Sequence, residues 1–77
     1  MNEQEREDRR IRDENLARHF LKHKIKVHAV LNNGGFYNGL ITEVSHYFFF
    51  LVDVEDGTKL IFYKDLKKPL EEYTEDK

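Results

Sequence analysis

The spacing of apolar residues changes at Ile25, and this change limits the folds open to the chain. Upstream, Leu16 and Phe20 are one helical turn apart and acid-to-base pairs recur four residues apart, which predicts a helix. Downstream, apolar residues recur at every second position over 25–31, as is typical of a half-buried strand. Turn signals at 32–35 (Asn-Asn-Gly-Gly) and 56–57 (Asp-Gly) divide this part into short segments. The sequence therefore predicts one helix followed by short antiparallel strands.

The helix, predicted over the first 24 residues, offers few apolar side chains for packing. Before Ile11 the only apolar residue is Met1, so residues 1–10 are expected to be a frayed, charged segment. Asp13 is expected to cap the part of the helix that packs. We therefore predict that the helix acts as a lid on the strands and does not itself form the core.

The strand-forming segments are short and closely spaced. They are expected at 25–31, 36–44, 46–54, 59–64 and 66–70. Pro69 restricts the last of them to a sheet edge. Gly39 lies inside the second, where a glycine commonly marks a sharp bend or a bulge. These elements predict a mainly β fold, in which an N-terminal α-helix precedes a small, strongly bent, five-stranded antiparallel barrel.

The short chain constrains how such a barrel can be stabilised. Its 77 residues suffice for one domain, followed by an acidic tail at 71–77 that is expected to be disordered. A domain of this size buries only about 60% of the surface that its unfolded chain exposes. The absence of cysteine excludes disulfides as a remedy. Self-association is the remaining common way to stabilise so small a fold.

Charge and hydropathy exclude further classes of protein. The net charge is −2, so any binding of nucleic acid must rely on local basic patches or on base stacking. Every arginine lies at or before Arg18, so the basic residues are unevenly placed. No apolar run approaches the roughly 20 residues that span a bilayer, and the N-terminus does not resemble a secretory signal. We therefore expect a cytoplasmic protein without a membrane partner.

No motif predicts catalysis. Without cysteine there is no thiol nucleophile or thiolate metal site, and Gly34-Gly35 lacks the frame of a phosphate-binding loop. His19 and His23 have the i,i+4 spacing that can hold a divalent metal, but no third ligand is identifiable. A solvated helix face is the preferred interpretation of this pair. We expect a protein that is not an enzyme and that needs no metal or cofactor.

An aromatic cluster begins the third predicted strand. Alternation places Phe48 and Phe50 on one face of the strand and Tyr47 and Phe49 on the other. For the three phenylalanines we prefer a role in packing the barrel. Tyr47 differs because it follows Ser45-His46 at the turn into the strand, where an aromatic ring beside polar groups can stack a base.

Three segments together resemble the Hfq branch of the Sm-like family. They are residues 33–51 (NGGFYNGLITEVSHYFFFL), 11–16 (IRDENL) and 60–65 (LIFYKD). The order and spacing of these segments match the family without a gap in the longest one. The resemblance covers roughly residues 11–70, which we take as the predicted Sm-like domain.

The resemblance implies a homohexameric ring that binds single-stranded RNA and acts as an RNA chaperone. In this family A-rich strands bind one face of the ring, U-rich strands bind the opposite face near the pore, and basic rim residues promote RNA–RNA annealing. On the pore side the implied RNA contacts are His46, Tyr47, Tyr63 and Lys64. On the opposite face they are Gly34, Gly35, Phe36, Tyr37 and Asn38, and on the rim Arg18, Lys22 and Lys24.

Two residues depart from the family pattern at the pore side. Ser45 replaces an aspartate, and Asp65 replaces the histidine that follows the lysine. Asp65 removes a donor to the base and adds a negative charge beside Lys64. These departures keep an alternative open, in which the barrel is a structural or protein-assembly module with weakened RNA binding.

Overall fold

The computed structural model describes residues 2–74 as one helix packed on one antiparallel sheet. Along the chain the elements are α1 (Glu3–His23), β1 (Val27–Val30), β2 (Phe36–Val44), β3 (Phe48–Asp53), β4 (Gly57–Phe62), the 3₁₀ helix η1 (Tyr63–Asp65) and β5 (Glu71–Glu72). The strand order is β4-β3-β2-β1-β5, with every neighbouring pair antiparallel. This confirms the predicted fold class, a mainly β protein with an N-terminal helix and five antiparallel strands.

α1 begins ten residues earlier than the predicted cap. Asn2 and Glu5 form a capping box, in which each side chain accepts a hydrogen bond from the backbone N–H of the other, at 2.8 and 3.1 Å. The prediction that Asp13 caps the helix is wrong, because Asp13 lies inside α1 and is buried. Residues 3–10, expected to be frayed, are the first turns of the same helix.

The strand predictions differ most at the C-terminal end. β2 has the predicted bounds, and β1, β3 and β4 lie within or close to the predicted segments. The fifth strand is not at 66–70 but at Glu71–Glu72, where it pairs with Val27 and His28 of β1. Leu66 and Leu70 are buried in the core instead. The predicted disordered tail, 71–77, thus begins with a strand, and its residues 75–77 lie outside the described residues.

β2 combines a close approach with a bulge. A Cβ added at Gly39 would lie 1.9 Å from the carbonyl oxygen of Val52, so only glycine lets these two backbones meet. The pairing of β2 with β3 shifts register between Ile41 and Glu43. The predicted bend is therefore a bulge at Thr42, three residues after Gly39, and the glycine itself serves the contact with β3.

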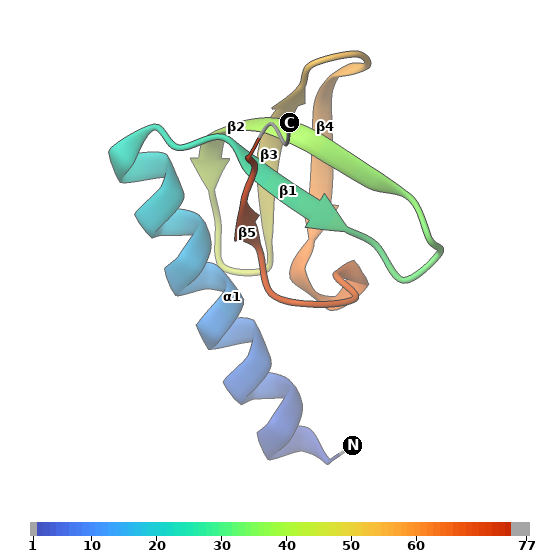
Figure 1. Ribbon diagram of the computed structural model, residues 1–77. Coiled ribbons are helices and arrows are strands. Elements are labelled where there is room, and N and C mark those ends of the chain that lie inside the picture. Colours follow the sequence, from blue (N-terminus) through green and yellow to red (C-terminus); the bar gives the residue numbers. More distant parts are fainter. Residues whose placement is uncertain (1, 75–77) are drawn as a thin grey trace.

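The core lies between α1 and the sheet. Phe49 and Leu51 of β3 are fully buried, while Phe48 and Phe50 lie half-buried on the other face. This is the alternation expected of the aromatic strand. From α1, Ala17 and Phe20 reach the same core. Figure 1 shows α1 along one side of the sheet, with its first turns extending past the strands at the end where η1 lies.

A buried carboxylate orders the turn between β3 and β4. Asp53 accepts hydrogen bonds from the backbone N–H groups of Asn38, Glu55 and Asp56 at 2.8–2.9 Å. These bonds hold the pKa of Asp53 below its ordinary value of 3.8, the bond from Asn38 first among them. Asp53 thereby ties the turn to β2.

The depressed pKa of Asp53 predicts a loss of stability in acid. Because the folded state binds this proton more weakly than the unfolded state, the stabilisation is present above 3.8 and is lost as the pH falls through the folded pKa. Asp53→Asn is expected to lower the melting temperature at neutral pH and to reduce its further fall in acid. Melting curves at several pH values check this, with the exposed Asp65→Asn as the control. If the melting temperature of Asp53→Asn fell in acid as steeply as that of the wild type, this prediction would be contradicted.

Candidate nucleic-acid interface

Tyr47 lies in the loop between β2 and β3, with 61% of its surface exposed. Tyr63 of η1 anchors this loop through two hydrogen bonds. Its backbone N–H donates to the carbonyl oxygen of Tyr47 at 3.1 Å, and its hydroxyl donates to that of Ser45 at 2.7 Å. The ring of Tyr47 is therefore presented to solvent on a fixed backbone.

Tyr63 itself is buried, which differs from the RNA contact that the sequence implied. Only 3% of its surface is exposed. Burial raises the pKa of its hydroxyl to about 12, so the hydroxyl stays protonated and donates to Ser45 at neutral pH. The geometry makes Tyr63 a positioning residue for the Tyr47 loop.

α1 contacts the same loop through Arg10. Its Nη1 donates to the carbonyl oxygen of His46 at 2.7 Å, and its guanidinium lies 5.4 Å from the ring centroid of Tyr47. The same nitrogen also reaches Glu14 Oε1 at 2.7 Å. Glu14 in turn lies 3.5 Å from His46 Nδ1, and the His46 ring packs edge-on against Tyr47. These contacts fix the helix against the loop.

A pocket of about 750 Å³ opens between the first turns of α1 and the segment that follows β4. Pockets of about 300–1,000 Å³ are typical of ligand sites. From the loop, η1 and its flanks come Tyr47, Phe62, Tyr63, Lys64, Leu66, Lys67, Lys68 and Pro69. From α1 come Glu3, Arg6, Glu7, Arg9, Arg10, Arg12 and Asp13.

The pocket is positively charged although the chain is acidic overall. Its lining holds seven basic and three acidic side chains, whereas the whole chain carries a net charge of −2. Two of the three acids are paired, Glu7 with Arg10 at 2.8 Å and Asp13 with Arg12 at 3.0 Å. Burial raises the pKa of Asp13, with Arg12 acting against it. The local field therefore favours an anion.

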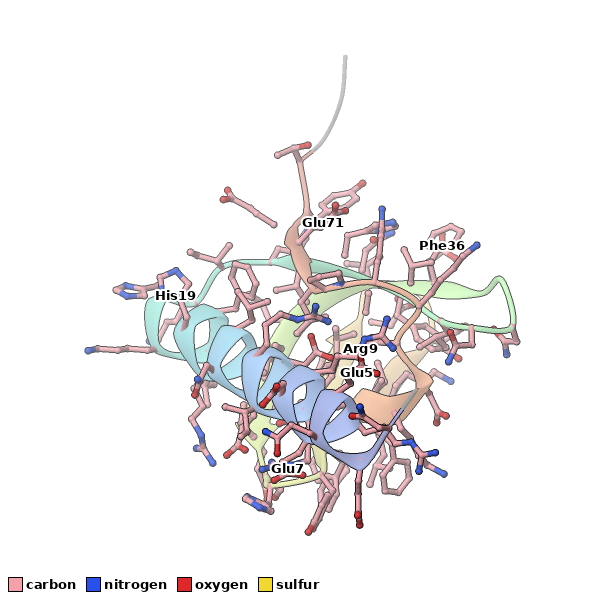
Figure 2. All side chains as sticks on the ribbon, turned by 90° about the horizontal axis from the view of Figure 1, so that it is seen from below. Glu5, Glu7, Arg9, His19, Phe36 and Glu71 are labelled. Atoms are coloured by element: carbon pink, nitrogen blue, oxygen red, sulfur yellow. The ribbon has the colours of Figure 1, made fainter. Side chains whose placement is uncertain are left out.

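The residues predicted for the opposite face lie elsewhere. Gly34 and Gly35 are in the β1–β2 hairpin, and the next three residues begin β2. Phe36 is 58% exposed, and Figure 2 shows it on this hairpin, away from α1. Lys59 lies over the ring of Tyr37, and Asn38 is hydrogen-bonded to His28. Within the described residues, none of these five lines the pocket.

The predicted rim residues occupy the C-terminal half of α1 and its cap. Arg18 is paired with Glu14 at 2.7 Å, while Lys22 and Lys24 are exposed. The ring centroids of His19 and His23 lie 4.6 Å apart, with the rings tilted by 54°. Over residues 2–74, no group of three or more histidine or acidic side chains is arranged to hold a metal ion.

Of the four residues expected at the pore side, Tyr47, Tyr63 and Lys64 line the pocket and His46 does not. Most of the other lining residues were not expected at a site. The cations of the first helical turns and Lys67-Lys68 were not assigned to a site. The confinement of all arginines to the first 18 residues was the signal that indicated the helical cations.

Comparison of the sequence with protein-family models and with curated proteins finds no match in either case. Among the described residues, no helix has the length and apolar character needed to cross a membrane.

Proposed function

We propose that this protein binds single-stranded RNA on the surface formed by Tyr47 and the cationic pocket. The observation that carries the proposal is an exposed aromatic ring at a pocket with four more basic than acidic side chains, in a chain of net charge −2. A base stacks on Tyr47, and the basic side chains neutralise the adjacent phosphates. Lys64 lies at the same pocket and acts on the backbone as a point charge.

This chemistry fits a single strand, because the bases of a single strand are free to stack on a protein ring. Base–aromatic stacking is worth about 1–3 kcal/mol per base and tolerates any sequence. Phosphate contacts add a salt-dependent, sequence-independent contribution. Phe62, also in the pocket lining and 39% exposed, offers a second apolar surface. The expected ligand is thus single-stranded RNA with modest base preference.

Replacing Tyr47 tests the stacking directly. Tyr47→Ala is expected to weaken the binding of a short U-rich or A-rich RNA by about 1–3 kcal/mol per site. Tyr47→Phe keeps the ring and should bind nearly as the wild type does. Fluorescence anisotropy titrations with labelled RNA measure both. Equal affinities for all three proteins would exclude stacking on Tyr47.

We also propose that the chain assembles into a homo-oligomeric ring, with six copies as the Sm-like resemblance implies. β4 and β5 are the two edges of the sheet and do not pair with each other within the described chain. Leu60 and Phe62 on β4, Val52 on the adjacent β3 and Leu40 on β2 expose apolar surface. Open strand edges and contiguous apolar surface favour pairing with another chain.

A charge on β4 should break this assembly. Leu60 is 46% exposed, so Leu60→Glu leaves the core intact but places a carboxylate on the edge strand. Sedimentation is expected to give about 56 kDa for a wild-type hexamer of 9.3 kDa chains, and a smaller species for the variant. Val54→Glu, in the β3–β4 turn, is the matched control. A stable wild-type monomer at micromolar concentration would contradict the ring.

An assembly module without RNA binding is the second candidate. Asp65 favours it, because its exposed carboxylate follows Lys64 directly and repels phosphate. An intact ring that binds neither RNA in the Tyr47 titrations would support this second candidate.

A further inference from the structure

We propose that the first three turns of α1 form one wall of a phosphate-binding cleft, and that Lys67 and Lys68 form the other. This rests on the proposed function, since the cleft would hold phosphates of the same strand whose base stacks on Tyr47. The sequence had assigned no role to residues 1–10. The structure builds them into the lining of the charged pocket.

The two sides of α1 face different parts of the pocket. Glu7 and Arg10 are three residues apart and share the side that contacts the Tyr47 loop. Arg9 and Arg12, also three apart, lie on the other side. Figure 2 shows Glu7 and Arg9 on opposite sides of the helix, with Arg9 toward the segment after η1. The ring of Tyr47 therefore lies on one side of α1, and Arg9 and Arg12 lie on the other side.

Opposite Arg9, the chain leaves η1 and runs over Lys67 and Lys68 before reaching β5. The N–H of Lys67 donates to the carbonyl oxygen of Val30 at 2.8 Å, which anchors this segment to β1. Both lysine side chains are exposed, and both line the pocket. Lys68 Nζ lies 3.3 Å from Oε1 of the exposed Glu71. The segment is thus a fixed backbone that carries two solvent-facing cations.

Cations on two facing walls suit a linear anion better than a compact one. A phosphodiester backbone carries one charge per nucleotide, so successive phosphates can engage Arg9 and Lys67 together. The acids in the lining do not cancel this field, because seven basic side chains outnumber three acidic ones. The cleft therefore recognises the backbone, while Tyr47 recognises the base.

Two probes of equal charge separate these contributions. One is a labelled uridine hexamer, and the other is a labelled hexamer in which every base is absent. The double variant Arg9→Gln/Lys67→Gln removes one cation from each wall. The control, Lys26→Gln/Lys59→Gln, removes two cations outside the pocket. Circular dichroism verifies that each variant is folded.

The double variant is expected to bind both probes about tenfold more weakly at 0.1 M salt. The slope of log K against log salt concentration should also become shallower by about 1.4, because two phosphate contacts on a single strand are lost. Tyr47→Ala should weaken only the uridine hexamer, and the control should leave both probes nearly unchanged.

Each other result overturns a defined statement. Unchanged binding of the uridine hexamer by the double variant would exclude the cleft and leave the proposed function standing. Equal losses in the double variant and the control would show a non-specific charge effect and exclude the cleft as well. If the wild type binds neither probe, the cleft and the proposed function both fail.

Discussion

Gly39→Ala is expected to lower the free energy of unfolding by about 3 kcal/mol, which is a large share of the stability of a small domain. The new Cβ would lie 1.9 Å from the carbonyl oxygen of Val52 and 2.7 Å from its carbonyl carbon. Both atoms belong to the backbone of β3, so the strand must move and its pairing with β2 must change. Chemical denaturation followed by circular dichroism measures the loss.

Gly35→Ala is the matched control for this substitution. The nearest atom to its new Cβ is the side-chain Oδ1 of Asn33 at 3.1 Å, which can rotate away. We expect a change of less than about 1 kcal/mol. If both alanine variants unfold at the denaturant concentration of the wild type, the close approach at Gly39 does not constrain the sheet.

Phe20→Ala is expected to cost about 3–5 kcal/mol, because it removes a ring that α1 inserts into the core. Phe20 is 8% exposed and belongs to the same buried cluster as Val27 and Phe49. Its carbonyl oxygen also accepts the N–H of Ile25, at the point where the chain turns from α1 toward β1. Loss of the ring therefore weakens the attachment of the helix to the sheet.

Ile11→Ala provides the comparison on the same helix. Ile11 is 42% exposed, so its truncation should change the free energy of unfolding by no more than about 1 kcal/mol. Denaturation curves of the two variants distinguish a docked helix from a loose one. Equal, small effects would contradict docking through Phe20.

The fold was largely predictable because the alternation over 25–31 marked the change from helix to strands. The Asn-Gly and Asp-Gly turn signals then bounded the segment 36–44 and placed the hairpins. The end of the sheet was not predictable in the same way. Leu66 and Leu70 resemble strand residues, but both turn into the core, and the pairing with β1 falls on two glutamates. Tertiary packing determined which of these residues enter the core and which pair with β1.

The predicted start of α1 was wrong for a related reason. The absence of apolar residues before Ile11 suggested fraying, but helix formation there depends on capping and on ion pairs. Asn2 and Glu5 cap the helix, and Arg10 is paired with Glu7 and Glu14. An apolar pattern alone does not register such contacts.

The candidate site was predictable only in part. Local pattern and resemblance both indicated Tyr47, and the resemblance alone indicated Tyr63 and Lys64. The charged pocket depends on side chains more than 50 residues apart in sequence, such as Arg9 and Lys67. Only the folded chain brings these residues together, so no local pattern could have joined them.

Ultraviolet cross-linking of bound RNA, followed by mass spectrometry of the peptides, tests the central claim most directly. The wild-type protein would be irradiated with a short uridine-rich RNA at saturating concentration. We predict a cross-link to Tyr47, and none in Tyr47→Ala, because the ring of Tyr47 is the surface on which the base stacks. A cross-link confined to 34–38, or none at all in the wild type, would contradict RNA binding at the Tyr47 pocket.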